Sequence, residues 1–193
     1  MLVLPYPSDW QHAADYVRHM DLHPLREPRA FFRELTVCTE IGMNENRRSR
    51  MKRLSADIRD RITASNCKRV YLSRGKSGVT RELANESEIA AILEDNEFVK
   101  ISVSAPPSQI RKALRDADIC VSMEGSHVAH AILALPERSR LVIINPGDRF
   151  VTIFADYATL VGKRISYLVP EKRENGHHLL RTDLREALTD AAP

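Results

Sequence analysis

The 193-residue chain is 43% hydrophobic and 28% charged, a composition typical of a globular protein that can bury a sizeable core. Its 29 basic and 26 acidic side chains give a net charge of +3, and this near balance does not indicate nucleic-acid binding. No apolar run is long enough to cross a membrane, and the N-terminal sequence MLVLPYPSDW lacks the features of a secretory signal. We therefore expect a cytoplasmic protein without a transmembrane segment.

The cysteine pattern agrees with this expectation. The three cysteines, Cys38, Cys67 and Cys120, are an odd number and have no CxxC spacing. Reduced thiols in the cytoplasm explain such a pattern most simply, and the pattern predicts no zinc site.

The first part of the chain contains short elements separated by prolines. We expect a strand at residues 2–5 and a helix at residues 9–20, where apolar side chains gather on one side. Pro24 and Pro28 are expected to break the chain. The sequence of residues 35–38 is compatible with a short strand but is ambiguous in its secondary structure.

A basic helix is predicted at residues 46–65. Its apolar side chains recur every three or four residues and form one stripe, at Met51, Leu54, Ile58 and Ile62. The rest of its surface is strongly basic, with Arg47, Arg48, Arg50, Lys52, Arg53, Arg59 and Arg61. We interpret this surface as a solvated outer face. Contact with phosphate or nucleic acid is the alternative, which no interleaved aromatic residue supports.

From residue 68 onward, strands and helices alternate. Apolar runs predict strands at residues 68–73, 98–104, 119–121, 140–145 and 164–169. Helices are predicted at residues 85–95, 108–116, 128–135, 149–160 and from residue 180 onward. Ser108 and Asp148 are the expected caps of two of these helices, and residues 176–178 are expected to form a loop. The alternation predicts an α/β fold, a Rossmann-like parallel sheet with helices on both faces.

Ligands of such sheets bind at the carboxyl ends of the strands. The predicted strand ends bring residues 73–74, 104–106, 123–126 and 145–147 to one edge of the sheet. Side chains that could bind a phosphate lie in two of these four segments.

The turn that follows the third of these strands is the first candidate. Gly125 permits close backbone approach, and Ser126 and His127 could donate hydrogen bonds to phosphate oxygens at the start of a helix. Glu124 could accept from a ribose or sugar hydroxyl, or it could be a carboxylate favoured by the helix dipole. A structural strand-to-helix turn is the alternative, and His130 on its own is more typical of a packed helix.

The basic loop that follows the first of these strands is the second candidate. Ser73 and Arg74 open it and Arg81 lies near its end, and arginine suits bidentate phosphate recognition. The sequence GKSG lacks the first glycine of a Walker A loop, and a flexible surface loop is the alternative. Asn85 is expected mainly to cap the next helix, and Glu86 to suit its dipole.

Both candidate segments resemble the family-61 glycosyltransferases. The series YLSRGKSGVTRELANESEI matches a family pattern of a strand, Ser-Arg, a variable loop, Arg and then Asn-Glu at the start of a helix, here Ser73, Arg74, Arg81, Asn85 and Glu86. The second landmark is a Gly-rich turn after Ala-Asp, here Glu124, Gly125, Ser126 and His127 with His130. Many members have a histidine at the position of Glu124, so a role that needs this histidine is not carried over. The resemblance covers residues 68–170.

The resemblance implies a GT-B architecture, in which the C-terminal Rossmann-like domain binds the nucleotide-sugar donor without a metal or other cofactor. Residues 68–193 would be this donor-binding domain. Residues 1–67 are too short for a complete acceptor domain and would be its partial remnant, with the basic helix as connector. A missing N-terminal domain or a homo-oligomer is therefore expected.

The implied function is transfer of a sugar from a nucleotide-sugar to a polysaccharide or glycan acceptor, as in capsule biosynthesis. Arg74, Arg81, Glu124, Gly125, Ser126 and His127 would bind the donor, and Ser73, Asn85, Glu86 and His130 would support them. No catalytic base is identified. The alternatives are a truncated, non-catalytic nucleotide-binding domain and a GT-B-like polysaccharide pyruvyl transferase.

Overall fold

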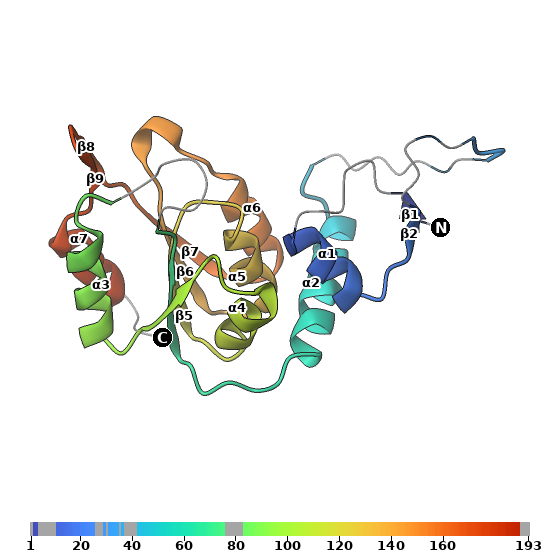
Figure 1. Ribbon diagram of the computed structural model, residues 1–193, viewed down its shortest axis with the longest axis horizontal. Helices are drawn as coiled ribbons and strands as arrows, with labels where there is room; N and C mark the ends of the chain where they lie inside the picture. The colour runs from blue at the N-terminus through green and yellow to red at the C-terminus, as the bar shows by residue number, and fades with distance from the viewer. Residues whose placement is uncertain are drawn as a thin grey trace.

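The computed structural model describes residues 2–3, 11–25, 29, 31–34, 36, 42–75 and 83–189. Its centre is a five-stranded sheet in the order β4-β3-β5-β6-β7 (Figure 1). The strands are β3 (Arg69–Ser73), β4 (Val99–Ser102), β5 (Ile119–Met123), β6 (Arg140–Ile144) and β7 (Arg164–Leu168). All four neighbouring pairs are parallel. The predicted Rossmann-like α/β fold is therefore confirmed.

The strand order has one reversal. After β3 the chain adds β4 on one side and then returns to add β5 on the other, which is the 2-1-3-4-5 order of flavodoxin-like folds. The point between β3 and β5 is the topological switch point, where the loops at the carboxyl ends of the two strands diverge and leave a crevice.

Helices cover both faces of the sheet. Figure 1 shows α3 (Glu86–Asp95) and α7 (Arg181–Thr189) on one side, and α4 (Pro107–Leu114), α5 (Val128–Ala134) and α6 (Ile153–Leu160) on the other. Side chains of β3 alternate between two cores, because Val70 and Leu72 pack with the α4–α5–α6 layer whereas Tyr71 packs with α3 and α7. Because crossovers between parallel strands are right-handed, the order of the strands determines which helices lie on each face of the sheet.

The sequence predicts the central strands well because both faces of these strands are buried. Every residue of β5 and of β6 is buried, so each strand is a continuous apolar run with few polar interruptions. Burial of one such aliphatic side chain stabilises the fold by about 1.5–3 kcal/mol. The loops at the ends of these strands are therefore attached to fully buried strands of the core.

The N-terminal region packs beside the α4–α5–α6 layer (Figure 1). α1 (Gln11–His19) contacts α4, and α2 (Glu45–Asp60) contacts α5 and α6. The Asn44 side chain caps α2 by accepting from the Arg47 amide at 2.9 Å. The predicted apolar stripe faces inward, since Ile58 is fully buried, and Ser55 Oγ donates to the Leu133 carbonyl at 2.8 Å.

Two further strands lie near the N-terminus. β1 (Leu2–Val3) pairs in parallel with β2 (Pro24–Leu25), so the expected chain break at Pro24 is a short strand. Its length of two residues is compatible with proline at an edge position. Of the ambiguous strand at residues 35–38, only Thr36 lies within the described residues.

Three sequence predictions about helix caps and loops are wrong. α4 begins at Pro107 with Pro106 as its N-cap, because proline has the backbone geometry of a first helical residue, so Ser108 lies inside the helix. Asp148 lies in a 3₁₀ turn, η1 (Gly147–Arg149), and caps no α-helix because its carboxylate pairs with Lys172. The expected loop at residues 176–178 is β9 (Gly176–His178), which forms a hairpin with β8 (Glu171–Arg173).

Within the described ranges, no helix is both long and apolar enough to cross a membrane.

Candidate functional site

The main feature at the switch point is a contact between the loops that follow β3 and β5. Arg74, the residue after β3, donates from Nη1 to the main-chain carbonyl of Glu124, the residue after β5, at 2.7 Å. This hydrogen bond places a cationic guanidinium at the crevice where ligands of such sheets bind. The two candidate segments predicted from the sequence therefore meet in the fold.

Gly125 makes this close approach possible. It has φ +158°, and a Cβ atom added there would lie 2.5 Å from Arg74 Nη1 and 2.8 Å from His127 Cε1. Real side chains do not tolerate such distances, so only glycine allows Arg74 and the His127 ring to flank the turn.

The turn itself is built from main-chain hydrogen bonds. The Glu124 amide still pairs with the Ile144 carbonyl at 2.9 Å, so the strand register continues to the start of the turn. The Val128 amide then donates to the Gly125 carbonyl at 3.0 Å and begins the helical ladder of α5. Ser126 is exposed at the tip, whereas the Glu124 side chain is buried.

The His127 side chain is directed back onto the end of β5. Only 7% of the residue is exposed, and Nε2 lies 2.9 Å from both the Met123 carbonyl oxygen and Ser122 Oγ. A carbonyl oxygen only accepts, so Nε2 carries the proton in this contact. The imidazole thus holds the turn against the strand, with its Nδ1 edge beside Gly125.

The basic loop after β3 is only partly within the described residues. Ser73 is buried at the end of β3, and its carbonyl accepts from the Val103 amide at 2.9 Å. Arg81 lies outside the described residues, so its predicted role beside Arg74 stays a prediction.

Asn85 and Glu86 contact structural partners. Asn85 is the N-cap residue of α3, as predicted, but its side chain makes no capping hydrogen bond to the helix. Its amide instead joins both main-chain groups of Leu179, by Nδ2 to the carbonyl at 2.9 Å and by Oδ1 to the amide at 3.1 Å. Glu86 accepts from the Tyr71 hydroxyl at 2.5 Å, and burial followed by the Glu86 charge raises the pKa of Tyr71. These contacts fix α3 to β3 and to the segment before α7.

His130 is a packed histidine that contacts the N-terminal region. It is buried, its Nδ1 lies 2.7 Å from the Tyr16 hydroxyl, and the two rings stack with centroids 5.5 Å apart. The Arg111 guanidinium lies 4.9 Å from the centre of the Tyr16 ring and pairs with Asp15 at 2.6 Å. This cluster of α1, α4 and α5 was not predicted, because short-range sequence patterns do not relate residues so far apart.

A rim at the carboxyl edge was also missed. Asp148, in the segment after β6, pairs with Lys172 at 2.9 Å and with His177 at 3.2 Å, both on the β8–β9 hairpin. The Lys172 ammonium, followed by His177, holds the pKa of Asp148 below its usual value. The His177 carbonyl in turn accepts from the Ala84 amide at 2.7 Å, near the start of α3. The hairpin thus links the segments that lead to α3 and α6.

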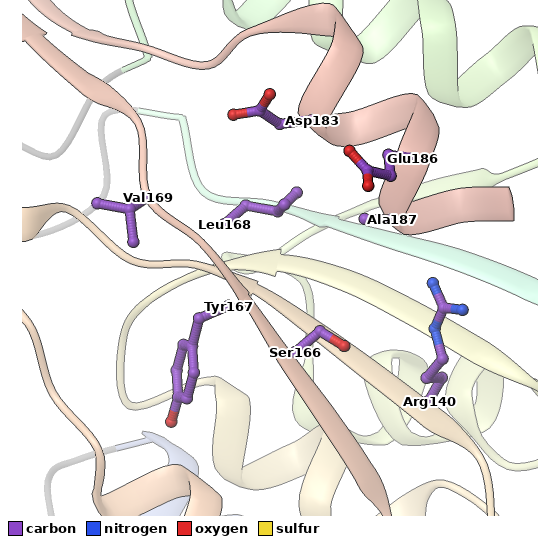
Figure 2. Close-up of a pocket in the computed structure, with 8 residues that line it drawn as sticks. All are labelled: Arg140, Ser166, Tyr167, Leu168, Val169, Asp183, Glu186 and Ala187. Atoms are coloured by element: carbon purple, nitrogen blue, oxygen red, sulfur yellow. The ribbon is translucent and has the colours of Figure 1, made fainter. Parts of the chain in front are cut away.

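A cavity of about 360 Å³ lies elsewhere, between edge strand β7 and α7 (Figure 2). Figure 2 shows the Arg140 guanidinium and the Glu186 carboxylate lining it. The switch point is two strands away from β7, so this cavity is separate from the candidate site. Among the described side chains, no group of His, Cys, Asp or Glu is arranged to hold a metal ion.

The model of one protein family, described as Glycosyltransferase 61, matches residues 3–142, which is more than half of the chain. The chain belongs to glycosyltransferase family 61. The family match begins at residue 3, whereas the resemblance noted in the sequence begins at residue 68. The family match ends within β6. Both α1 and α2 and the two loops at the switch point therefore lie inside the family match, and glycosyl transfer is the general chemistry that this membership supports. No curated protein matches the chain.

Proposed function

We propose that this protein binds the diphosphate of a nucleotide-sugar at the switch point and transfers the sugar to a glycan acceptor. The observation that carries the proposal is the contact of Arg74 with the Glu124 carbonyl beside Gly125. It combines a fixed cation, a close backbone approach and the usual ligand position of a flavodoxin-like sheet.

In the proposed reaction, an acceptor hydroxyl oxygen forms a bond to the anomeric carbon while the bond from that carbon to the phosphate oxygen breaks. The nucleoside diphosphate leaves with the bonding electrons, and the hydroxyl proton passes to a base that we do not assign. Negative charge therefore grows on the leaving diphosphate. Arg74, together with Arg81 in this proposal, stabilises that charge, which is how preorganised cations lower such barriers.

The other turn residues bind the donor in this proposal. Ser126 is exposed at the tip of the turn and contacts a phosphate or sugar oxygen. Glu124 accepts from a sugar or ribose hydroxyl, and His127 contributes its main-chain amide, because its ring contacts Met123 and Ser122. The Arg74 and Arg81 charges replace a metal in this scheme.

We further propose that residues 68–193 form the donor half of a GT-B enzyme. In this arrangement α2 connects the donor half to acceptor-side structure, and residues 1–67 contribute part of that side. Two contacts show that the N-terminal region packs directly on α5: Ser55 Oγ donates to the Leu133 carbonyl, and the Tyr16 hydroxyl contacts His130.

Calorimetric titration with a panel of UDP- and GDP-sugars tests the proposal. We expect saturable binding of at least one donor, with the nucleoside diphosphate as a competitor because it carries the groups that Arg74 contacts. Incubation of the bound donor with glycan acceptors, followed by mass analysis, then tests sugar transfer against pyruvyl transfer. Absence of binding across the whole panel would contradict the proposal.

A further inference from the structure

Three exposed apolar side chains lie at the carboxyl edge of the sheet, after β6 and β7, and one of them, Val169, also lines the cavity between β7 and α7. Phe150, Ile153 and Val169 are 45%, 47% and 50% exposed. Phe150 and Ile153 belong to the segment that follows β6, and Val169 directly follows β7 (Figure 1). All strands of the sheet are parallel, so these residues leave the same carboxyl edge as Arg74 and Gly125.

The Phe150 ring is supported from one side. Its centroid lies 5.1 Å from that of Tyr167, with a tilt of 54° between the two rings. The segment that contains Phe150 is also fixed to the end of β6, because Asn145 Nδ2 donates a hydrogen bond to the Val151 carbonyl at 3.0 Å. A partly exposed ring that a neighbouring aromatic ring holds in place is preorganised to stack with a flat ligand.

Asn145, which holds the segment of Phe150, also has an amide oxygen, Oδ1, that lacks a partner among the described residues. The residue is fully buried at the end of β6. A buried amide oxygen normally accepts a hydrogen bond, so its donor would be a bound water or a ligand N–H or O–H group.

We infer that Phe150 is the stacking platform for the base of the nucleotide, an inference that rests on the proposed function. Arg74 follows β3 and Phe150 lies in the segment after β6, and these two strands are separated by β5 alone. Neighbouring strands lie about 4.8 Å apart, so the ends of β3 and β6 are about 10 Å apart, a distance that a nucleotide can span between its phosphates and its base. The cation Arg74 matches the diphosphate, and the partly exposed Phe150 ring matches the base. Every nucleobase has a π-face, so stacking by itself serves uracil and guanine alike.

Calorimetry with UDP, GDP and inorganic pyrophosphate separates the contribution of the base from that of the phosphates. We expect Phe150→Ala to weaken binding of the preferred nucleotide by about 10-fold or more, as typical for loss of one stacking aromatic, and to leave pyrophosphate binding unchanged. Phe150→Tyr should restore tight nucleotide binding because it keeps a ring. Phe31→Ala is the matched control, since it removes an exposed phenylalanine (92% exposed) from the N-terminal region.

A fluorescence measurement covers the case in which Phe150→Ala does not fold. Phe150→Trp is made together with Trp10→Phe, which removes the only natural tryptophan. Stacking predicts that the nucleotide quenches Trp emission and that pyrophosphate does not. Equal nucleotide affinity of the unaltered and Phe150→Ala proteins, or pyrophosphate binding as tight as nucleotide binding, would overturn the inference alone. Failure of all three probes to bind the unaltered protein would overturn the proposed function with it.

Discussion

The hydroxyl of Tyr16 in α1 lies 2.7 Å from Nδ1 of His130 in α5, and the two rings stack almost in parallel, 13° apart. The contact joins the N-terminal region to the helix that begins at the candidate turn. A partly buried hydrogen bond with a stacked ring fixes both position and orientation, so we expect α1 to be part of the cooperative fold.

Tyr16→Phe should therefore lower the free energy of unfolding by about 1–2 kcal/mol, because it removes one partly buried hydrogen bond and keeps the ring. Tyr16→Ala should cost more, since the ring over the Arg111 guanidinium is lost as well. Urea denaturation measures both, with Tyr157→Phe as a matched control on α6. An unchanged midpoint for Tyr16→Ala would show that α1 does not contribute to the cooperative fold.

Lys163 makes the stability of the protein depend on pH. Burial, followed by the Arg59 charge, lowers its pKa from 10.5 to about 8. Between these two values the unfolded chain holds a proton that the folded chain has released, so the free energy of unfolding rises with pH in this window. Below pH 8 both states are protonated, and the folded protein carries the full cost of a buried charge.

Lys163→Met should thus be more stable than the unaltered protein at pH 7, by about 2 kcal/mol after allowance for the lost contact of Nζ with Ser55 Oγ at 3.4 Å. The advantage should shrink as the pH rises from 8 to 10. Denaturation of both proteins at several pH values measures the difference. A difference that stays constant across this range would mean that Lys163 keeps its proton.

Gly125→Ala is expected to affect both the site and the fold. The new Cβ would meet Arg74 Nη1, which can move away at the cost of its contact with Glu124, and the buried His127 ring, which Ser122 and Met123 hold in place. We expect nucleotide affinity to fall by about 10-fold and the free energy of unfolding to fall by about 1–3 kcal/mol because of the unusual φ.

Ser49→Ala is the control for this variant. Ser49 is exposed on α2, away from the candidate site, so this change should alter neither quantity strongly. Unchanged nucleotide affinity in Gly125→Ala would show that the close approach of Arg74 does not serve binding.

Asn85→Ala tests whether this residue of the family pattern is structural. Its amide bridges both main-chain groups of Leu179, so its loss should lower the free energy of unfolding by about 1–3 kcal/mol. Nucleotide affinity of the folded variant should not change. The opposite result, normal stability with weakened binding, would place Asn85 in the ligand site. Asn46→Ala, on the exposed side of α2, is the control.

The parts of the fold that the sequence predicts are those governed by local patterns. β5 and β6 are continuous buried runs, and α2 has one apolar stripe, so their existence follows from the period of apolar residues. The helix starts were less predictable. Ser108 and Asp148 are good caps by type, yet Pro106 precedes α4 and Asp148 contacts the hairpin. The strand β9 is short and polar, so no apolar alternation indicated it.

The candidate site could be predicted only as two separate segments. The order β3-β5 that brings Arg74 to the Glu124 carbonyl depends on the packing of the whole sheet, which no local pattern determines. The same is true of the rim, where Asp148 meets His177, and of the Tyr16–His130 contact. The sequence predicts which chemical groups these side chains carry, but it does not predict which residues they contact in the fold.

The central claim is that Arg74 holds the diphosphate of the donor at the switch point between β3 and β5. Its most direct test is the calorimetric affinity of Arg74→Ala for UDP and GDP beside that of Arg48→Ala, which removes an exposed arginine of α2. We predict that Arg74→Ala weakens binding of the preferred nucleotide by about 10- to 100-fold, as loss of a charged hydrogen bond implies, and that Arg48→Ala does not. Equal affinities of Arg74→Ala and the unaltered protein would contradict the account.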